Sequence, residues 1–190
     1  MFDSARFIED CRAAITESSP RHAVRELLAR ELESSADVAA RLGREEAGLE
    51  VLYNADDLTV LNVIWAPGMT LYPHDHRMWA AIGIYGGQEA NRFYRRGAEQ
   101  LQASGERLLD TGDVFSLGRE AIHAVHNPRQ AFTGAIHVYG GDFVNAPRSQ
   151  WDPDRLIEEP FDLGQVRGLF AQANEEWRNQ LGQDLDERVL

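Results

Sequence analysis

The sequence predicts a mainly β protein in which helices precede and follow an antiparallel sandwich or barrel. Short apolar or alternating runs recur between residues 49 and 140, spaced about ten residues apart. Turn-forming residues separate these runs, and no helical periodicity falls between them. Short, closely spaced strands of this kind are typical of antiparallel sandwiches and barrels.

A helical preface is expected over residues 1–47. Apolar side chains at three- and four-residue spacing predict a first helix over residues 2–18. Ser19 and Pro20 then form a helix-start signal, because a capping hydroxyl precedes a proline in the first turn. A second helix is expected to run from there to about Arg41.

The expected barrel covers residues 48–146. Turn signals such as Pro67-Gly68 and Asn127-Pro128 separate its strands. The strands are predicted at runs 49–53, 58–65, 69–73, 78–85, 89–96, 101–109, 113–117, 121–126 and 131–140.

After Pro147 the chain is expected to leave the sheets, so that residues 147–190 form a helical tail. Apolar residues between Val166 and Leu181 predict an amphipathic helix of about 18 residues that covers one face of the barrel. The preface, barrel and tail are expected to form a single domain of 190 residues.

Composition excludes several classes of partner. The 19 basic and 31 acidic residues give a formal net charge of −12, which argues against nonspecific nucleic-acid binding and against docking to anionic membranes. No secretory signal is visible at the amino end, and no apolar run approaches the roughly 18 residues of a membrane span. Cys11, the single cysteine, is interpreted as a small buried hydrophobe. A cytoplasmic protein is therefore expected.

Two histidines in one predicted strand form half of a metal site. Side chains two positions apart in a strand share a face, so His74 and His76 are expected to point the same way. Some 47 residues later, His123 begins a His-x3-Asn pattern that ends at Asn127. His126 is expected on the opposite face of its strand from His123, because an odd separation reverses the face.

A second histidine pattern lies in the last predicted strand. His137 and Tyr139 share a face, and an imidazole that orients a phenol can make a proton-donating pair. The alternative interpretation is an aromatic core stripe that contains one buried histidine.

The segment Gly68–His76, which reads Gly-x5-His-x-His, and the segment around His123 together resemble the paired motifs of the cupin superfamily. The resemblance covers roughly residues 58–140. It implies a double-stranded β-helix barrel, jelly-roll-like, that holds a metal at one end through His74, His76 and His123. The glutamate that usually completes the first motif is missing, because Ala80 and Ala81 occupy its positions.

Three metal histidines without glutamate, followed by a His-x-Tyr strand, are similar to the thiol dioxygenase branch of the cupins, which includes cysteine and 3-mercaptopropionate dioxygenases. There a Ser-x-His-x-Tyr strand forms a hydrogen-bonded relay beside the iron. His137 and Tyr139 match that strand, and Ala135 replaces the serine. The missing link is expected to be lost or supplied by Thr133 or water.

This resemblance implies an Fe(2+) enzyme that oxidises a small thiol with O2 to its sulfinic acid, with Tyr139 and His137 as catalytic residues. Cysteine dioxygenases place an arginine on an early strand to hold the substrate carboxylate, whereas residues 52–57 here contain no basic residue. Either the substrate has no carboxylate there, or another arginine binds it. The nearest candidates in sequence are Arg77, Arg92, Arg95 and Arg96.

Other functions stay open at this level. A three-histidine cupin dioxygenase that cleaves a carbon–carbon bond in a diketone is the main enzymatic alternative, and a zinc or manganese isomerase is another. A non-catalytic cupin sensor is the alternative outside enzymes, because one fold serves many functions. The partners expected are a small thiol and O2, without nucleic acid or membrane, and the protein is expected to be a monomer or a homodimer.

Overall fold

The computed structural model describes the backbone of residues 1–187 and the side chains through Leu181. The helices are α1 (Ser4–Ala14), α2 (Pro20–Leu32), α3 (Ser35–Leu42) and α4 (Leu163–Glu187). The strands are β1 (Gly48–Asn54), β2 (Thr59–Trp65), β3 (Thr70–Asp75), β4 (Ala80–Gly86), β5 (Gln88–Arg96), β6 (Leu101–Asp110), β7 (Val114–Leu117), β8 (Ile122–His126), β9 (Thr133–Tyr139), β10 (Ser149–Trp151) and β11 (Glu158–Pro160).

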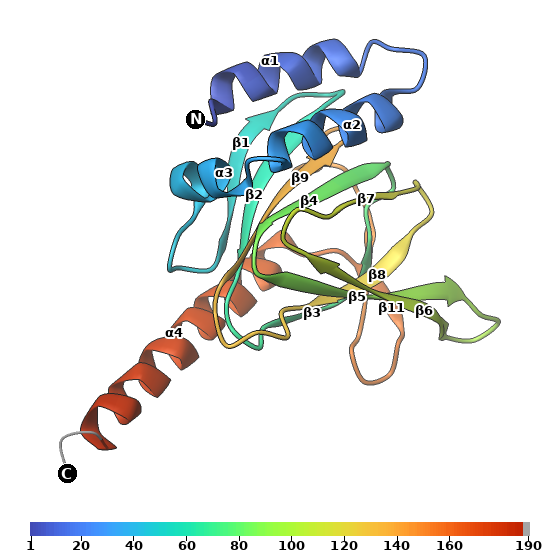
Figure 1. The fold of residues 1–190 in the computed structure, drawn as a ribbon. Coiled ribbons are helices and arrows are strands. Elements are labelled where there is room, and N and C mark those ends of the chain that lie inside the picture. The colour runs from blue at the N-terminus through green and yellow to red at the C-terminus, as the bar shows by residue number, and fades with distance from the viewer. Residues whose placement is uncertain (188–190) are drawn as a thin grey trace.

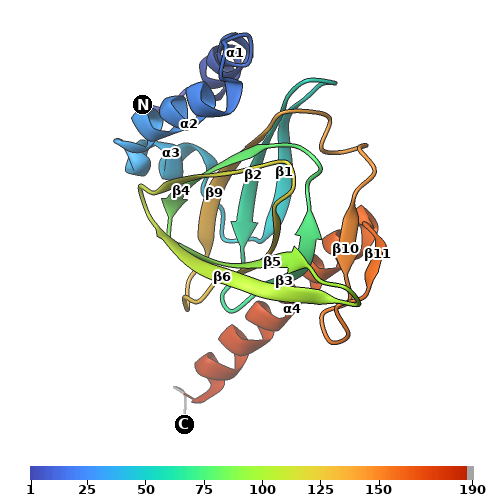
Figure 2. The same ribbon diagram turned by 90° about the vertical axis from the view of Figure 1, so that its right-hand side faces the viewer.

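Two antiparallel sheets face each other, as Figures 1 and 2 show. One has the order β1-β2-β9-β4-β7 and the other has the order β11-β10-β3-β8-β5-β6. Strands distant in sequence pair in both sheets, since β9 lies between β2 and β4 while β8 lies between β3 and β5. This winding is a double-stranded β-helix, and it confirms the predicted fold class.

Helices cover the outer side of the first sheet, which we call the helix-covered sheet. Helices α2 and α3 pack on β4, and α1 packs on α2 (Figure 1). Alternate residues of β2 therefore reach two different cores: Leu61 and Val63 face the second sheet, whereas Val60 and Ile64 face the helices. Every residue of β2 and β9 is buried for this reason.

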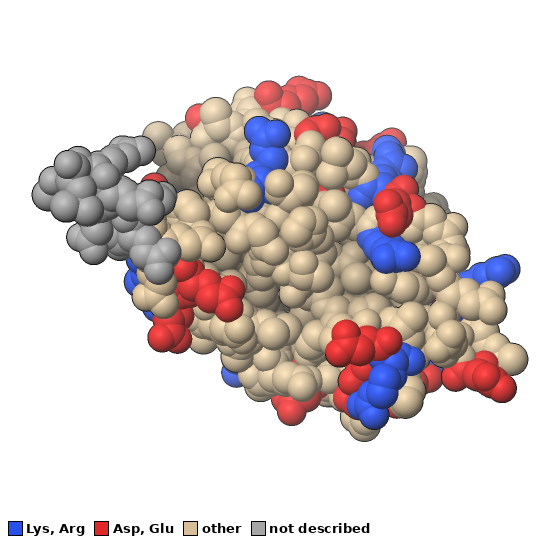
Figure 3. Space-filling view, turned by 90° about the horizontal axis from the view of Figure 1, so that it is seen from below, with Lys and Arg blue, Asp and Glu red and all other residues tan. Residues whose placement is uncertain are grey.

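The second sheet, which we call the open sheet, has no helix layer over most of its outer face (Figure 2). Burial of the side chains therefore alternates along strand β5: Glu89 and Asn91 are buried inside the barrel, and Arg92 is exposed outside. Seen from below, acidic and basic side chains are scattered around a largely uncharged central area (Figure 3).

The helical preface is confirmed, with one correction. The second predicted helix is two helices, because the chain turns between Leu32 and Ser35 so that α2 and α3 both reach β4. Pro20 occupies the first turn of α2 as predicted, and Gly43 follows the last residue of α3. Cys11 is buried without a disulfide partner, and burial raises the pKa of its thiol to about 12.

The expected helical tail is also corrected, because the chain returns to the open sheet after Pro147. Strand β10 pairs with β11 and contacts β3, with Gln150 opposite His74. Only then does α4 begin, and its first turns close one end of the barrel rather than covering a face. Phe170 stacks on Trp65 at 5.3 Å between ring centroids, while Leu181 is exposed as the helix extends outward (Figure 1). Residues 188–190 of the expected tail lie outside the described part of the chain.

None of the helices in the described part of the chain combines the length and the apolar character that crossing a membrane requires.

Candidate metal centre

The structure brings His74, His76 and His123 together inside the barrel. His74 and His123 lie directly opposite each other on the paired strands β3 and β8, and His76 follows β3 by one residue. A β-bulge shifts the register between Leu71 and His74, so both side chains line the cavity although three positions separate them. All three imidazoles are buried.

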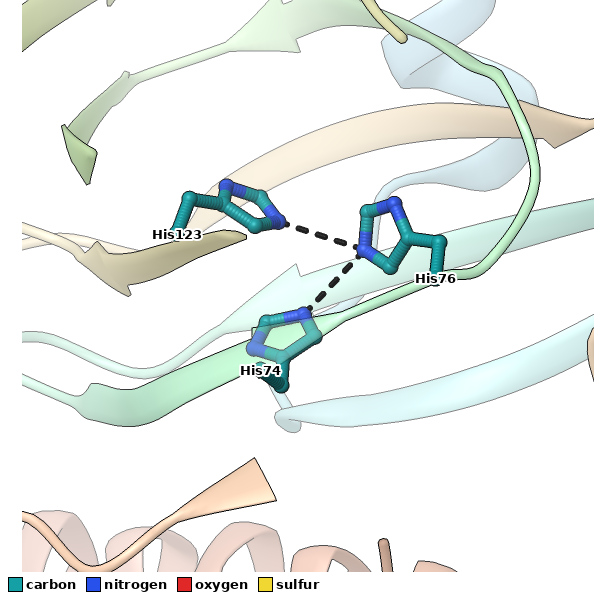
Figure 4. A group of neighbouring side chains, drawn as sticks. All are labelled: His74, His76 and His123. Atoms are coloured by element: carbon teal, nitrogen blue, oxygen red, sulfur yellow. Dashed lines mark hydrogen bonds between the residues drawn. The ribbon is translucent and has the colours of Figure 1, made fainter. Parts of the chain in front are cut away.

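The Nε2 atoms of the three imidazoles point toward one another (Figure 4). The Nε2 atom of His76 lies 3.2 Å from Nε2 of His74 and 3.2 Å from Nε2 of His123. Hydrogen bonds on the other ring nitrogen fix two of the rings: His74 Nδ1 donates to the Tyr72 carbonyl at 3.1 Å, and His123 Nδ1 donates to Asn91 Oδ1 at 2.7 Å. Those two Nε2 atoms therefore carry lone pairs.

Burial keeps the three rings neutral. It lowers the pKa of His74 to about 4, although the Tyr72 carbonyl opposes the shift. The pKa values of His76 and His123 lie well below their usual range, because burial disfavours the charged form and the neighbouring imidazoles add to the effect.

This donor set fits a divalent metal ion. Nitrogen lone pairs that converge repel one another unless a cation lies between them. Metal–nitrogen bonds of roughly 2.0–2.1 Å at octahedral or tetrahedral angles separate the nitrogens by about 2.8–3.4 Å, a range that includes the two distances found here. The three histidines form the group of potential metal ligands among the described residues, and no carboxylate belongs to it.

His137 and Tyr139 project from β9 into the same cavity. His137 Nδ1 lies 3.0 Å from the Tyr139 hydroxyl, and the Tyr139 ring meets His76 edge-on with 5.0 Å between centroids. Burial raises the pKa of Tyr139 far above its usual value, so the phenol keeps its proton at neutral pH. The predicted pair therefore lies beside the three histidines.

A buried carboxylate, which the sequence reasoning missed, completes this arrangement. Glu89 is fully buried on β5, and its Oε2 atom lies 3.6 Å from His137 Nε2. Trp65 Nε1 donates to Oε2 at 2.9 Å, and Asn91 Nδ2 donates to Oε1 at 2.9 Å. Burial alone would raise the pKa of Glu89. The neighbouring His137, Asn91 and Trp65 outweigh it, so the pKa is lowered.

Thr133 does not replace the missing relay serine. Its hydroxyl exchanges hydrogen bonds with the backbone of Gln88 and donates to Asn127 Oδ1. Asn127 is itself occupied with loop backbone, since its amide donates to the carbonyls of Trp65 and Ala66. His126 faces the outer side of the open sheet as predicted, with Nδ1 2.9 Å from the Thr70 hydroxyl.

The four arginines proposed from sequence do not reach the cavity. Arg77 and Arg96 bind Asp75 at 2.7 and 3.3 Å, Arg92 lies 3.6 Å from Glu106, and Arg95 is exposed. The arginine that does lie beside the cavity follows β9 by nine residues and was missed, because its segment was expected to leave the barrel.

That arginine is Arg148, which is buried at 7% exposure. Its guanidinium carbon lies 3.9 Å from the Phe143 ring centroid and 3.8 Å from that of Phe161. Nη1 donates to backbone carbonyls, whereas Nε and Nη2 are buried without a hydrogen-bond partner among the described residues. Burial lowers the pKa of Arg148 to about 10, which leaves the group charged at neutral pH.

A hydrogen bond ties the Arg148 segment to the histidine strand. Asp75, which lies between His74 and His76, accepts from the backbone nitrogen of Ser149 at 2.8 Å. Its second oxygen binds Arg77 and Arg96. We call the contact between Asp75 and Ser149 the Asp75–Ser149 tether.

The cavity beside the three histidines is small, with a volume of about 30 Å³, and Arg148 is not among the residues that line it. The three histidines, His137 and Tyr139 form its polar wall, and Phe143, Phe161 and Val166 contribute to its apolar wall. Both phenylalanines that line it also stack on Arg148. The site therefore suits a ligand of few heavy atoms.

No family model matches the chain. Among solved structures, the chain is similar to an RmlC-like cupin with a double-stranded β-helix fold from Methanocaldococcus jannaschii, with 11% identity, 54% of this chain and 89% of that chain covered, and a TM-score of 0.45. A cupin superfamily protein from Desulfitobacterium hafniense has 15% identity, coverage of 55% and 88%, and a TM-score of 0.45. A cupin domain from Bordetella pertussis has 18% identity, coverage of 51% and 95%, and a TM-score of 0.40. These three structural neighbours are cupin proteins.

Proposed function

We propose that the protein is a mononuclear non-haem iron dioxygenase that oxidises a small thiol carrying a carboxylate to its sulfinic acid. One observation carries the proposal: among the described residues, three neutral histidines without a carboxylate converge beside a His–Tyr pair and near a buried arginine whose Nε and Nη2 have no hydrogen-bond partner. The three features lie on different elements and face one small cavity or the aromatic rings that line it.

Three neutral imidazoles leave a divalent metal its full charge, and nitrogen ligands of intermediate softness suit iron(II). A bound iron(II) would supply open coordination positions for a thiolate and for O2. The overall reaction needs no further reductant: one thiol and one O2 give one sulfinic acid, the sulfur loses four electrons and O2 accepts them. Both oxygen atoms end on the sulfur.

Arg148 supports a carboxylate on the substrate. A guanidinium with two unpaired buried nitrogens requires an acceptor, because unpaired buried donors cost about 1–3 kcal/mol each. A carboxylate matches a guanidinium edge in charge and geometry. The two phenylalanines hold the guanidinium plane in place.

Tyr139 is the proton-bearing group on the cavity wall. It remains protonated at neutral pH, lies against His76, and bonds His137 through its hydroxyl. From this position its hydroxyl oxygen can accept a hydrogen bond from the ligand, or its proton can turn from His137 toward the oxygen atoms that are transferred.

Oxygen consumption tests the proposal. The metal-free protein is loaded with Fe(II) under anaerobic conditions, and O2 uptake is followed with 3-mercaptopropionate, cysteine, cysteamine and a diketone. We expect uptake with the carboxylate-bearing thiols and a sulfinic acid as product. Uptake with the diketone alone would establish the carbon–carbon-cleaving alternative, and zinc retention without O2 uptake on any thiol would exclude a thiol dioxygenase.

An arginine variant tests the carboxylate separately. Arg148→Gln is expected to raise the KM of carboxylate thiols by at least tenfold and to leave that of cysteamine unchanged. Arg107→Gln is the matched control, because Arg107 also stacks on a phenylalanine, 4.5 Å from the Phe115 ring centroid, but is exposed. An equal rise with cysteamine would show that Arg148 acts on packing and not on a carboxylate.

A further inference from the structure

Glu89 connects the two functional parts of the cavity. One of its oxygens lies 3.6 Å from His137, the partner of Tyr139, and the other accepts from Asn91, the partner of His123. Strand β5 places Glu89 and Asn91 two residues apart, so both side chains enter the barrel. His137 Nε2 has no hydrogen-bond partner among the described residues, and the Glu89 carboxylate lies just beyond hydrogen-bond distance from it.

We infer that Glu89 is a positioning residue that sets the tautomer of the metal-site histidine His123 through Asn91 and that of His137 directly. A carboxylate only accepts hydrogen bonds, so the Asn91 amide nitrogen must face Glu89 and the Asn91 oxygen must face His123. That oxygen holds the proton on His123 Nδ1 and leaves Nε2 free for a metal. The catalytic purpose of the relay rests on the proposed function, but the effect on metal binding does not.

The same logic applies to His137. A bare nitrogen lone pair would be repelled by the Glu89 carboxylate, so Nε2 of His137 carries a proton. In the neutral ring, Nδ1 then accepts the hydroxyl proton of Tyr139 across 3.0 Å. A carboxylate that orients an imidazole, which in turn bonds a hydroxyl, follows the logic of a catalytic triad. Glu89 thus lies where the resemblance predicted a serine or its substitute.

Because Trp65 donates to Glu89, replacing one carboxylate oxygen of Glu89 by nitrogen changes the direction of the neighbouring hydrogen bonds. The indole nitrogen can only donate, and it donates to Glu89 Oε2. In Glu89→Gln, the amide oxygen must therefore face Trp65, and the amide nitrogen must face Asn91. Asn91 then turns over and presents its own amide nitrogen to His123 Nδ1, which drives the ring proton to Nε2. The nitrogen that should bind a metal becomes protonated.

The test is a metal-binding cycle on the full chain, with Zn²⁺ and Co²⁺ as probes. We expect Glu89→Gln to weaken binding roughly ten- to a hundredfold, the effect typical of a group that orients a metal ligand. The double variant Glu89→Gln/Asn91→Asp places the carboxylate at position 91 instead of position 89. The glutamine amide then donates to this carboxylate, and the carboxylate accepts from His123 Nδ1 as the Asn91 oxygen does in the wild type. We expect it to bind within about threefold of the wild type, and Asn91→Asp alone to bind worse because two carboxylates then face each other.

The control is Glu50→Gln, because Glu50 also lies on a strand and accepts from an asparagine amide, at 3.2 Å from Asn62, but lies away from the histidines. It should bind the probe metals like the wild type. Nitrogen-15 NMR of the metal-free proteins should show a proton on Nδ1 of His123 in the wild type and in the double variant, and on Nε2 in Glu89→Gln.

Unchanged metal affinity in Glu89→Gln, or a folded double variant that binds no better than Glu89→Gln, would overturn the inference. If Glu89→Gln does not fold, the double variant decides alone by the same threefold criterion. A protein that follows this pattern but oxidises no thiol would leave the inference standing and remove the proposed function. A protein that oxidises thiols but whose metal affinity does not change in these variants would keep the proposed function and remove the inference.

Discussion

The helix-covered sheet and the open sheet contribute differently to the molecule. The central strands β2, β9 and β4 of the helix-covered sheet are buried on both faces, because helices pack on one side and the barrel interior lies on the other. The open sheet buries one face only, yet it supplies His74 and His123 together with Glu89 and Asn91. Most of the stability is thus expected from the first sheet, and the candidate metal ligands come mainly from the second.

Side chains from the two sheets come close to each other at His137. This residue and Tyr139 lie on β9, in the centre of the helix-covered sheet, and Glu89 reaches them from the open sheet. The His137–Tyr139 pair on the helix-covered sheet thus faces candidate metal ligands on the open sheet. We can test whether stability and metal binding depend on different sheets by measuring how substitutions change stability, metal affinity and turnover separately.

The largest effect is expected from His123→Ala, which should lower metal affinity by at least a hundredfold, because one of three ligands is lost. The far-ultraviolet circular dichroism should stay that of the wild type, since the helix-covered sheet is untouched. Metal content after dialysis measures the loss. His126→Ala is the matched control on the same strand, because His126 faces outward and bonds Thr70. Equal losses in both variants would contradict the assignment of the inner face.

Leu28→Ala should reverse this pattern. Leu28 is fully buried between α2 and the helix-covered sheet, and truncating such a leucine costs about 2–5 kcal/mol of unfolding free energy. Metal affinity should not change. Leu108→Ala, on the open sheet with 51% of Leu108 exposed, should cost less than about 0.5 kcal/mol. Urea unfolding of the two variants measures the difference, and similar costs would refute the division of stability.

Tyr139→Phe should keep the metal and slow turnover roughly a hundredfold, the lower end of what proton-transferring groups contribute. The substitution removes the hydroxyl that bonds His137 but keeps the ring that stacks on Phe143. Thiol-dependent O2 uptake at equal metal content measures the change. An unchanged rate would show that the tyrosine serves packing.

The smallest effect is a pH dependence located in the helix layer. Burial raises the pKa of Cys11 to about 12, whereas the thiol of an unfolded chain titrates near its usual value of about 9. Between these values the unfolded state binds fewer protons, so stability falls as the pH rises, by at most about 1.4 kcal/mol per pH unit. Wild type should lose about 1.4 kcal/mol more than Cys11→Ala between pH 8 and pH 10, measured by urea unfolding. Parallel pH profiles would contradict this.

The barrel was predictable because its strands follow simple patterns. Every run from β1 to β9 was expected within a few residues, since alternation or continuous apolar character marks each one. Strands β10 and β11 were missed because residues such as Gln150 and Glu159 are polar. Partners distant in sequence, such as His74 opposite Gln150, hold them in the open sheet. The local sequence pattern does not show which distant strand a segment will pair with.

The site was predictable where spacing encodes geometry and not where it depends on burial of charge. His-x-His and His-x-Tyr place two side chains on one face in any strand, so both pairs were expected in the cavity. Glu89 and Arg148 are charged residues of a kind that usually faces solvent, and nothing local distinguishes them from Arg92 or Glu106. Their roles depend on partners from other strands and loops, such as Trp65 and Phe161.

The Asp75–Ser149 tether connects the segment of the candidate metal ligands with the segment of Arg148. The tether joins the Asp75 side chain, which lies between two of the histidines, to the backbone nitrogen of the residue after Arg148, so one hydrogen bond links the segment that carries the nitrogen cluster to the segment that carries the guanidinium. Under the proposed function, a thiol bound at one end by the metal and at the other by Arg148 would have to match the distance between these two segments. The tether would then select substrates by the number of carbon atoms between their end groups, although neither Asp75 nor Ser149 lines the cavity.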